Sequence, residues 1–253
     1  MVGDRDLLAF RGGYYDLFVS LLWKEPGGEL LAAVAEGIEA RIGGARGLHS
    51  LLGEGWEEIG RFLAASPPGA LAETVADEYT RLFLAPGGPE VNPYESYYLT
   101  GRVWDRPLAV IRTFLKEIGL EKQAGFAEPE DSLAFELEVM RRLIARQEAA
   151  RDPDGEARWV NAQAVFLKEH LLVWGPVAAS DLAAARAAAF YRGVGKALGG
   201  FLELERDFFK GWGPADIKTL EDARRGYGGS GEWKGPLFDP SGGSDDPPPD
   251  HQA

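Results

Sequence analysis

The sequence predicts an all-α fold: a single compact domain of about nine helices that is not a simple up-and-down bundle. Apolar residues recur at spacings of three and four along most of the chain, as they do on one face of a helix. Runs that alternate β-branched and polar residues, which would indicate strands, are absent from the sequence. The periodic segments are unequal in length and joined by long irregular connections rich in glycine and proline, which argues against a regular bundle.

The first four predicted helices occupy the N-terminal third of the chain. Their apolar stripes cover residues 14–22, 29–38, 56–63 and 71–83. Each of the first three stripes is followed by adjacent glycines, adjacent prolines or both, which are predicted to end those helices. Proline lacks a backbone donor, and glycine is entropically costly in a helix. The fourth helix leads the chain into a loop rich in proline, glycine and tyrosine.

The fifth and sixth predicted helices follow that loop. Pro107 suits an early position of the fifth helix, and Gly119 is expected to close it. The sixth helix is predicted over residues 129–149, where Leu133, Leu137 and other apolar residues recur at spacings of four and three. Acidic residues cluster at its expected start.

Three more helices complete the predicted body. The seventh covers residues 159–174 and is expected to break at Gly175-Pro176. Ser180 or Asp181 is a candidate cap for an alanine-rich eighth helix. A hinge over residues 193–200 is expected to join it to a ninth helix, which ends near Lys210.

The composition changes at Gly211. The following 43 residues hold nine glycines, six prolines, eight acids and four bases, so they cannot bury enough apolar area to offset the cost of ordering the chain. We therefore predict an all-helical body over residues 1–210 and a largely flexible acidic tail over residues 211–253. Four aromatic residues could latch this tail onto the body: Trp212, Tyr227, Trp233 and Phe238.

Bulk properties exclude several classes of function. The chain has no cysteine, which excludes disulfides, thiolate metal sites and cysteine nucleophiles. No run approaches 18 apolar residues, and the first residues do not read as a secretory signal, so a cytoplasmic location without membrane insertion is expected. The formal charge of −13 disfavours nucleic acid as a partner and favours a basic partner, and the alternative is that the charge serves solubility alone.

No catalytic or metal-binding arrangement is visible. The GVGKALGG run at residues 193–200 has the wrong spacing for a phosphate loop, no preceding strand, and no Ser or Thr after its lysine, so close helix packing or a hinge is favoured. The three histidines offer no helix with two metal ligands at suitable spacing. His170 is predicted to be a packed histidine that donates to a backbone carbonyl. We expect no cofactor, no metal and no enzymatic activity.

The most informative stretch is residues 78–98, EYTRLFLAPGGPEVNPYESYY. Large apolar rings stand beside a rigid backbone that contains three prolines and two glycines. Such rings suit the wall of a groove that holds another chain better than they suit a solvated loop. The stretch therefore predicts a peptide-binding surface.

A second acidic stretch, residues 128–138, starts the sixth predicted helix. Acids in a first turn interact favourably with the helix dipole, and Pro129 suits the first helical position. The alternative is recognition of a basic or amide-bearing peptide. The residues alone leave both interpretations open.

These two stretches resemble the signatures of the TorD/DmsD/NarJ family of chaperones for redox enzymes. The first signature is matched by Glu78, Tyr79, Leu82, Phe83, Pro93, Tyr94, Glu95, Ser96 and Tyr98. The second is matched by Pro129, Glu130 and Asp131, followed by Glu136, Leu137 and Glu138. The family's histidine is Ser132 here, and a serine can still cap a helix or donate to a carbonyl. The resemblance covers roughly residues 10–207.

The resemblance implies binding without chemistry. Members of this family are all-helical and hold the signal peptide of a client, often a twin-arginine export signal on a molybdopterin enzyme, until its cofactor is inserted. By this analogy the apolar part of the peptide lies on Tyr79, Leu82, Phe83 and Tyr94, while Glu95 and Asp131 face the arginines. Pro93, Ser96, Tyr98, Pro129 and Ser132 complete the implied site with Glu78. The implied partner is the client's catalytic subunit or its signal peptide.

Two rival interpretations stay open. The first is a nucleotide-responsive or GTP-binding helical protein with weak hydrolase activity, since guanine nucleotide binding has been associated with parts of this family. The second is a plain helical interaction module in which the aromatic residues are simply core. The sequence also leaves open a homodimer formed by exchange of helical halves, and it does not identify the client.

Overall fold

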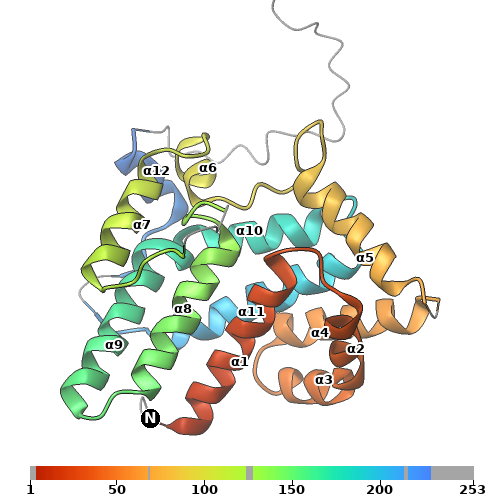
Figure 1. Ribbon diagram of the computed structural model, residues 1–253, viewed down its shortest axis with the longest axis horizontal. Coiled ribbons are helices and arrows are strands. Elements are labelled where there is room, and N and C mark those ends of the chain that lie inside the picture. The colour runs from red at the N-terminus through yellow and green to blue at the C-terminus, as the bar shows by residue number, and fades with distance from the viewer. Residues whose placement is uncertain (1–3, 68, 124–127, 214–215, 229–253) are drawn as a thin grey trace, which may run out of the picture.

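Every regular element of the described chain is helical (Figure 1). The computed structural model describes residues 4–67, 69–123, 128–213 and 216–228. Within them the only β-type pairing is a single bridge between Tyr94 and Ser132. The predicted all-α fold is therefore confirmed.

The described residues form twelve α-helices instead of the nine predicted, because the second predicted helix is divided in two and two short helices were not expected. The α-helices are α1 (Arg5–Leu22), α2 (Gly28–Glu36), α3 (Ile38–Arg46), α4 (Ser50–Ala65), α5 (Leu71–Tyr79), α6 (Glu95–Thr100), α7 (Arg106–Glu117), α8 (Leu133–Glu148), α9 (Pro153–Phe166), α10 (Leu172–Ala184), α11 (Phe190–Phe208) and α12 (Leu220–Gly226). Two π-helical segments, η1 (Thr80–Leu84) and η2 (Leu167–Leu171), continue α5 and join α9 to α10.

Helix α11 lies at the centre and packs between α4 and α10. Its glycines let the backbones of two helices touch: a Cβ on Gly200 would lie 2.3 Å from the backbone nitrogen of Leu52, and one on Gly193 would lie 2.7 Å from the carbonyl oxygen of Gly55. The run at residues 193–200 is thus a packing seam inside one helix, and the predicted hinge between two helices is wrong. Its Lys196 forms an ion pair of 2.5 Å with Glu58.

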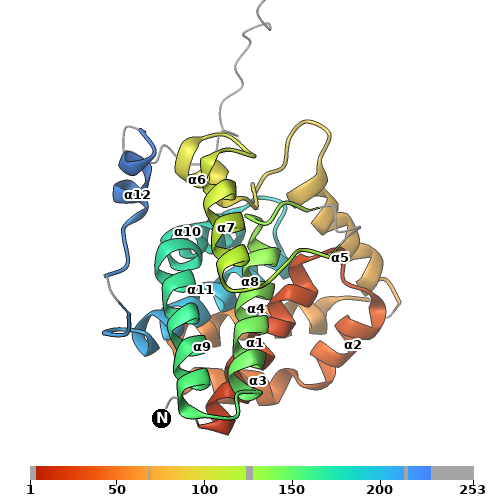
Figure 2. The same ribbon diagram turned by 60° about the vertical axis from the view of Figure 1, so that its left-hand side comes forward.

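A buried ion pair ties α1 to α11. The Arg11 guanidinium donates to both carboxylate oxygens of Glu205 at 2.7 and 2.8 Å, and the Tyr15 hydroxyl donates to the same carboxylate at 2.8 Å. All three side chains are almost completely buried, so each of them depends on the other two for its ion-pair or hydrogen-bond partner. On its other side α1 packs along α8, and α8 packs on α9 (Figure 2).

Several predicted helix boundaries are wrong for local reasons. Gly37 divides the second predicted helix into α2 and α3, whereas the glycines expected to end it lie inside α3. Pro176 lies inside α10, and the π-helical turn η2 immediately before α10 provides the irregular backbone that such a proline needs. Ser180 and Asp181 therefore lie within α10 and cap no helix.

The sixth predicted helix starts later than expected. Helix α8 begins at Leu133, and Ser132 is its N-cap, with the Phe135 amide donating to Ser132 Oγ at 3.3 Å. Pro129 and the acids beside it form a turn before the helix, so their interpretation as its first turn is wrong.

Part of the predicted tail lies on the body. Helix α12 packs on α6 and α10, and Arg224 donates to the carbonyl of Tyr98. Arg106 of α7 donates to the carbonyl of Tyr227 and lies 5.5 Å from its ring centroid. Tyr227 thus acts as one predicted latch, whereas Trp233 and Phe238 lie outside the described residues. The boundary after Lys210 stays a prediction. No helix in the described ranges has both the length and the apolar character to span a membrane.

Candidate functional site: an apolar pocket framed by the two motifs

The two sequence motifs lie against each other. The Glu95 amide donates to the Asp131 carbonyl at 2.8 Å, and the Leu133 amide donates to the Pro93 carbonyl at 2.8 Å. The Asp131 carboxylate also accepts from the Ser96 amide at 3.2 Å, at the start of α6. The loop before α6 and the turn before α8 are therefore one structural unit.

The acids of the first motif have buried structural partners. Glu78 accepts from the amides of Ala189, Phe190 and Tyr191 at 2.7–3.0 Å, so it caps α11 from α5. Both oxygens of Glu95 lie 3.2 Å from His170 Nδ1. Burial raises the pKa of Glu78 and of Glu95, although these partners pull each value down.

Neither Glu95 nor Asp131 can face arginines of a peptide in this conformation. Their exposed fractions are 1% and 0%, so both carboxylates lie in the interior and the expectation that they form an acidic edge is wrong. The predicted His170 contact is also corrected: this histidine is buried as expected, but its partner is the Glu95 carboxylate and not a backbone carbonyl.

The twelve residues of the predicted peptide site divide by exposure. Eight are buried: Glu78, Tyr79, Leu82, Glu95, Ser96, Tyr98, Asp131 and Ser132. Four are partly exposed: Phe83, Pro93, Tyr94 and Pro129. A direct contact with a peptide stays a prediction for this second group, and the first group builds the framework.

The tyrosines of the motif are held by hydrogen bonds. The Tyr94 hydroxyl donates to Glu128 at 2.8 Å, and the Tyr79 hydroxyl donates to the Leu22 carbonyl at 3.3 Å. Burial, followed by the charges of Glu128 and Glu25, raises the pKa of Tyr79 to about 12. Tyr79 therefore anchors the C-terminal end of α1 to the motif and stays protonated at neutral pH.

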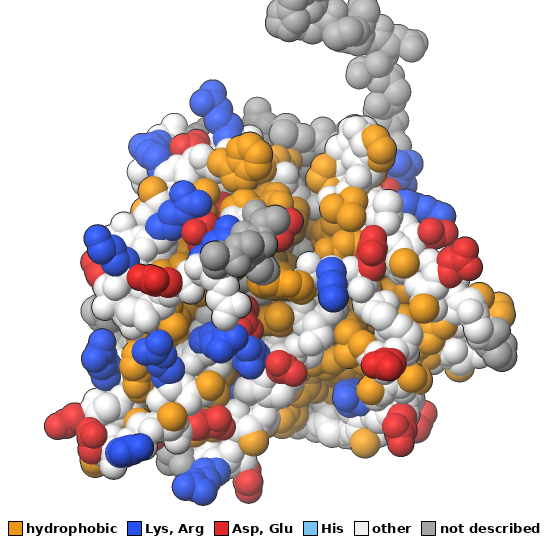
Figure 3. Space-filling model, viewed as in Figure 1, with side chains coloured by type: hydrophobic (Ala, Val, Ile, Leu, Met, Phe, Trp, Pro, Cys, Tyr) orange, Lys and Arg blue, Asp and Glu red, His pale blue; other side chains and the backbone are white. Residues whose placement is uncertain are grey.

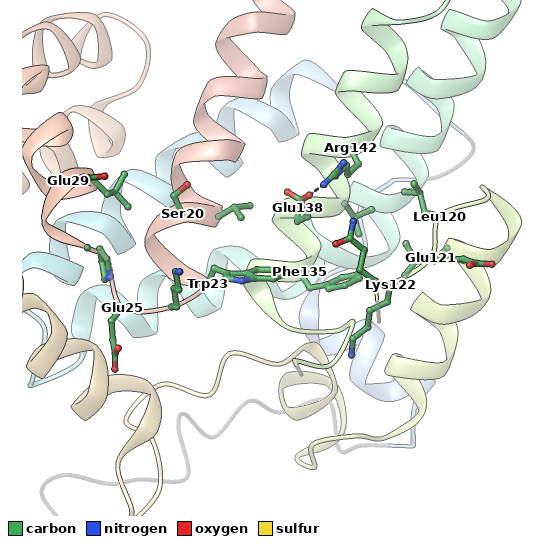
Figure 4. A pocket seen from close by; sticks show the side chains of 18 residues that line it. Ser20, Trp23, Glu25, Glu29, Leu120, Glu121, Lys122, Phe135, Glu138 and Arg142 are labelled. Atoms are coloured by element: carbon green, nitrogen blue, oxygen red, sulfur yellow. Dashed lines mark hydrogen bonds and ion pairs between the residues drawn. The ribbon is translucent and has the colours of Figure 1, made fainter. Parts of the chain in front are cut away.

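A pocket of about 680 Å³ lies directly beside this framework (Figure 4). Its lining residues fall between positions 19 and 30, 115 and 123, and 135 and 142. It is therefore enclosed by the end of α1, the start of α2, the end of α7 and the first turns of α8. Trp23 and Phe135 border its inner side, and the surface view shows a hollow lined with hydrophobic side chains in this region (Figure 3).

The motifs position the walls of this pocket. Ser132 caps α8 three residues before Phe135, and Tyr79 holds Leu22 directly before Trp23. None of the twelve predicted residues lines the pocket itself, so the sequence analysis missed it. The sequence did contain one signal of the pocket. Phe135 is a large apolar residue that lies off the apolar stripe of Leu133 and Leu137, so it is predicted to lie on another side of the helix.

The pocket carries charges of both signs. Glu25, Glu29 and Glu121 are acids of the lining. Burial alone would raise the pKa of Glu138, but its hydrogen bonds with Arg141 and Arg142 outweigh burial and lower it. Within the part of the chain that the structure describes, no group of three or more acids or histidines could hold a metal ion. The arrangement is suited to binding an apolar segment with charged flanks.

Comparisons with known proteins agree with the two motifs. The sequence profile of the nitrate reductase delta subunit family matches residues 46–180, which is more than half of the chain. A "Chaperone protein TorD" from Aeromonas salmonicida is 31% identical over 137 residues, or 54% of this chain and 61% of that protein. One from Photobacterium profundum is 29% identical over 139 residues, or 54% and 64%. The chain thus spans less than two thirds of the length of these relatives.

A crystal structure of a proposed redox enzyme maturation protein from Archaeoglobus fulgidus is also similar. It is 21% identical, with a TM-score of 0.41, and the match covers 75% of this chain and 93% of that one. This structural likeness is too distant to support a conclusion, whereas the profile covers both motifs and the helices that hold them. The chain belongs to the nitrate reductase delta subunit family, which includes the TorD- and NarJ-type proteins that its two motifs resemble.

Proposed function

We propose that the chain is a cytoplasmic chaperone for a redox enzyme that contains molybdopterin. In this role it binds the leader peptide or the cofactor-free form of the client's catalytic subunit. It guards the client until the cofactor is inserted and, for a twin-arginine leader, until export. Membership of the family and the names of its relatives support the chaperone role.

The observation that carries the proposal is the apolar pocket framed by the two family motifs. Leu30, Leu115 and Phe135 supply apolar walls, and acids stand in the same lining. An apolar segment gains free energy by leaving water for such a cavity, at about 25 cal/mol per Å² of buried apolar surface. A few buried anchors are therefore sufficient for a micromolar complex, which corresponds to about −8 kcal/mol.

The charges of the lining indicate how a leader peptide is oriented. Glu25 and Glu29 lie on the α1–α2 side of the pocket, whereas the Glu138 carboxylate is occupied by arginines of α8. In the proposed complex the two arginines of a leader lie against Glu25 and Glu29, and its apolar part enters the pocket. This assignment replaces the buried Glu95 and Asp131 as the acidic contacts.

Calorimetric titration of the full chain with a twin-arginine leader peptide tests the proposal. Ser20→Trp places a large ring in the pocket without removing core atoms, because Ser20 is a half-buried lining residue of α1. We expect it to weaken binding by at least about tenfold, or ~1.4 kcal/mol. Tyr94→Ala, which removes the partly exposed ring of the motif, is expected to weaken binding as well.

Asp16→Trp is the matched control. Asp16 lies one turn earlier on α1, is exposed, and is not part of the pocket lining. We expect this variant to bind the peptide as the unmodified chain does. Equal affinities for all of these variants would place the peptide elsewhere, and no measurable heat with the unmodified chain would remove leader binding from the proposed function.

A further inference from the structure

The pocket has apolar walls, and the chain also contains an apolar segment beyond the last described residue. Residues 232–240, EWKGPLFDP, contain Trp233, Leu237 and Phe238 within a segment otherwise dominated by glycine, proline and acids. The size and apolar character of these three side chains match a cavity of about 680 Å³ with an apolar wall.

The last described residues place this segment within reach of the pocket. Tyr227 is fixed beside Arg106 at the start of α7, and the pocket lies at the other end of α7, beside Leu115. Arg106 and Leu115 are nine residue steps apart along α7, which is ~14 Å at about 1.5 Å per residue. An extended chain covers about 20 Å from Tyr227 to Trp233 and more than ~35 Å to Phe238. The pocket is therefore accessible to the tail of the same molecule.

The tail and the outer surface of α7 and α8 carry opposite charges, which favours the tail as the occupant of the pocket. Lys and Arg side chains gather on the face that these helices form with α9, on the left in Figure 3. Arg112 and Lys116 of α7 and Arg142 and Arg146 of α8 are exposed bases, of which Arg112 and Arg142 already pair with Glu130 and Glu138. Residues 239–250 of the tail hold four aspartates and no base. When the apolar residues enter the pocket, these aspartates come close to a basic surface on an otherwise acidic protein.

We propose that residues 232–240 occupy the pocket of the same chain when no client is bound. Trp233, Leu237 and Phe238 supply the apolar contacts, and the aspartates that follow lie against the basic face of α7 and α8. The consequence for regulation rests on the proposed function: the tail competes with the client and shields the apolar walls while the chaperone is empty. A tethered segment has an effective concentration in the millimolar range, so even a weak contact is well populated.

Disulfide trapping tests the contact directly, because the full chain contains no cysteine. Phe238→Cys is combined with Ser20→Cys, which places a thiol in the pocket with little change of shape. The control combines Phe238→Cys with Val110→Cys, an exposed position of α7 that lies outside the pocket and nearer to Tyr227. Under mild oxidation we expect the pocket pair to cross-link within one chain at least about tenfold faster than the control pair.

Two outcomes would overturn the proposal. If the control pair cross-links as fast as the pocket pair, the tail samples the surface without a preferred site. If the pocket pair forms only dimers, at a rate that rises with protein concentration, the occupant is the tail of a second copy.

Competition with a client is measured on full-length variants. Trp233, Leu237 and Phe238 are changed together to Ser, and the control changes Pro247, Pro248 and Pro249 together to Ser. We expect the first variant to bind a leader peptide about two- to tenfold more tightly than the unmodified chain, because the competing fraction is removed. The control is expected to bind unchanged, and equal affinity for all three would contradict the competition.

The two hypotheses fail in different ways. A selective cross-link without leader binding to any variant supports the tail contact and contradicts the proposed function. Leader binding to every variant with equal affinity, and no selective cross-link, supports the proposed function and overturns the tail contact.

Discussion

Single residues of the family motifs act as scaffold in this protein. Glu78 satisfies three amides at the start of a helix more than a hundred residues away, and Ser132 caps α8. Helix starts leave backbone donors without partners, so an acceptor from elsewhere in the fold is valuable there. The serine that replaces the family's histidine thus keeps a structural role at this position.

We expect Glu78→Ala to lower the free energy of unfolding by about 1–3 kcal/mol, because it leaves buried amides of Ala189, Phe190 and Tyr191 without an acceptor. Denaturant unfolding of the full chain measures this loss. Asp77→Ala, at the exposed neighbouring position of α5, is expected to change stability by no more than about 0.5 kcal/mol. Similar losses in both variants would contradict the capping role of Glu78.

At the scale of elements, the seam between α4 and α11 holds the centre of the molecule together. Gly193 and Gly200 of α11 are required by contact, since added Cβ atoms would meet the backbone of α4. Gly43 in α3 has no such neighbour, because a Cβ added there would meet no atom within 4 Å. The same residue type is therefore a packing requirement in one helix and a cost in another.

Gly200→Ala and Gly43→Ala should act in opposite directions. We expect Gly200→Ala to destabilise by at least about 1–3 kcal/mol, because the Cβ would lie 2.3 Å from Leu52 N and the two helices must separate. Gly43→Ala is expected to stabilise by about 0.5–1 kcal/mol, since alanine favours an open position within a helix. Thermal unfolding of both variants checks the pair, and tolerance of alanine at position 200 would argue against a tight seam.

Across the whole molecule, charge is distributed between an interior cluster and the surface. Glu95, Asp131 and Glu136 lie in one buried region, where Trp174 Nε1 donates to both oxygens of Glu136 at 3.1 Å. Burial, then the charges of Glu95 and Asp131, raises the pKa of Glu136 well above its usual value. Between the ordinary pKa of about 4.5 and the raised pKa of Glu136, the folded protein binds a proton that the unfolded chain releases, so the stability that the protonated group contributes is lost as pH rises through the folded pKa.

We therefore expect Glu136→Gln to gain stability relative to the unmodified chain as pH rises from about 5 to 8. The slope is at most about 1.4 kcal/mol per pH unit for one proton. Urea unfolding at several pH values measures it. Glu138→Gln, two residues further along α8, is the matched control. The pKa of the Glu138 carboxyl is lowered, so the stability of this variant relative to the unmodified chain should stay constant over this pH range. A constant difference for Glu136→Gln would show that its carboxyl is ionised in the folded state.

Local sequence patterns were sufficient to predict the all-α fold and the family, because helical periodicity and the two motifs can be recognised without knowledge of long-range contacts. It also located the residues that join the two motifs, although it assigned buried acids such as Glu95 and Asp131 to the surface. The open side of the motifs could be identified only from the folded chain, since burial depends on segments far apart in the sequence. The pocket brings Trp23, Leu115 and Phe135 together from three such segments. Periodicity within any one of those segments contains no information about the other two.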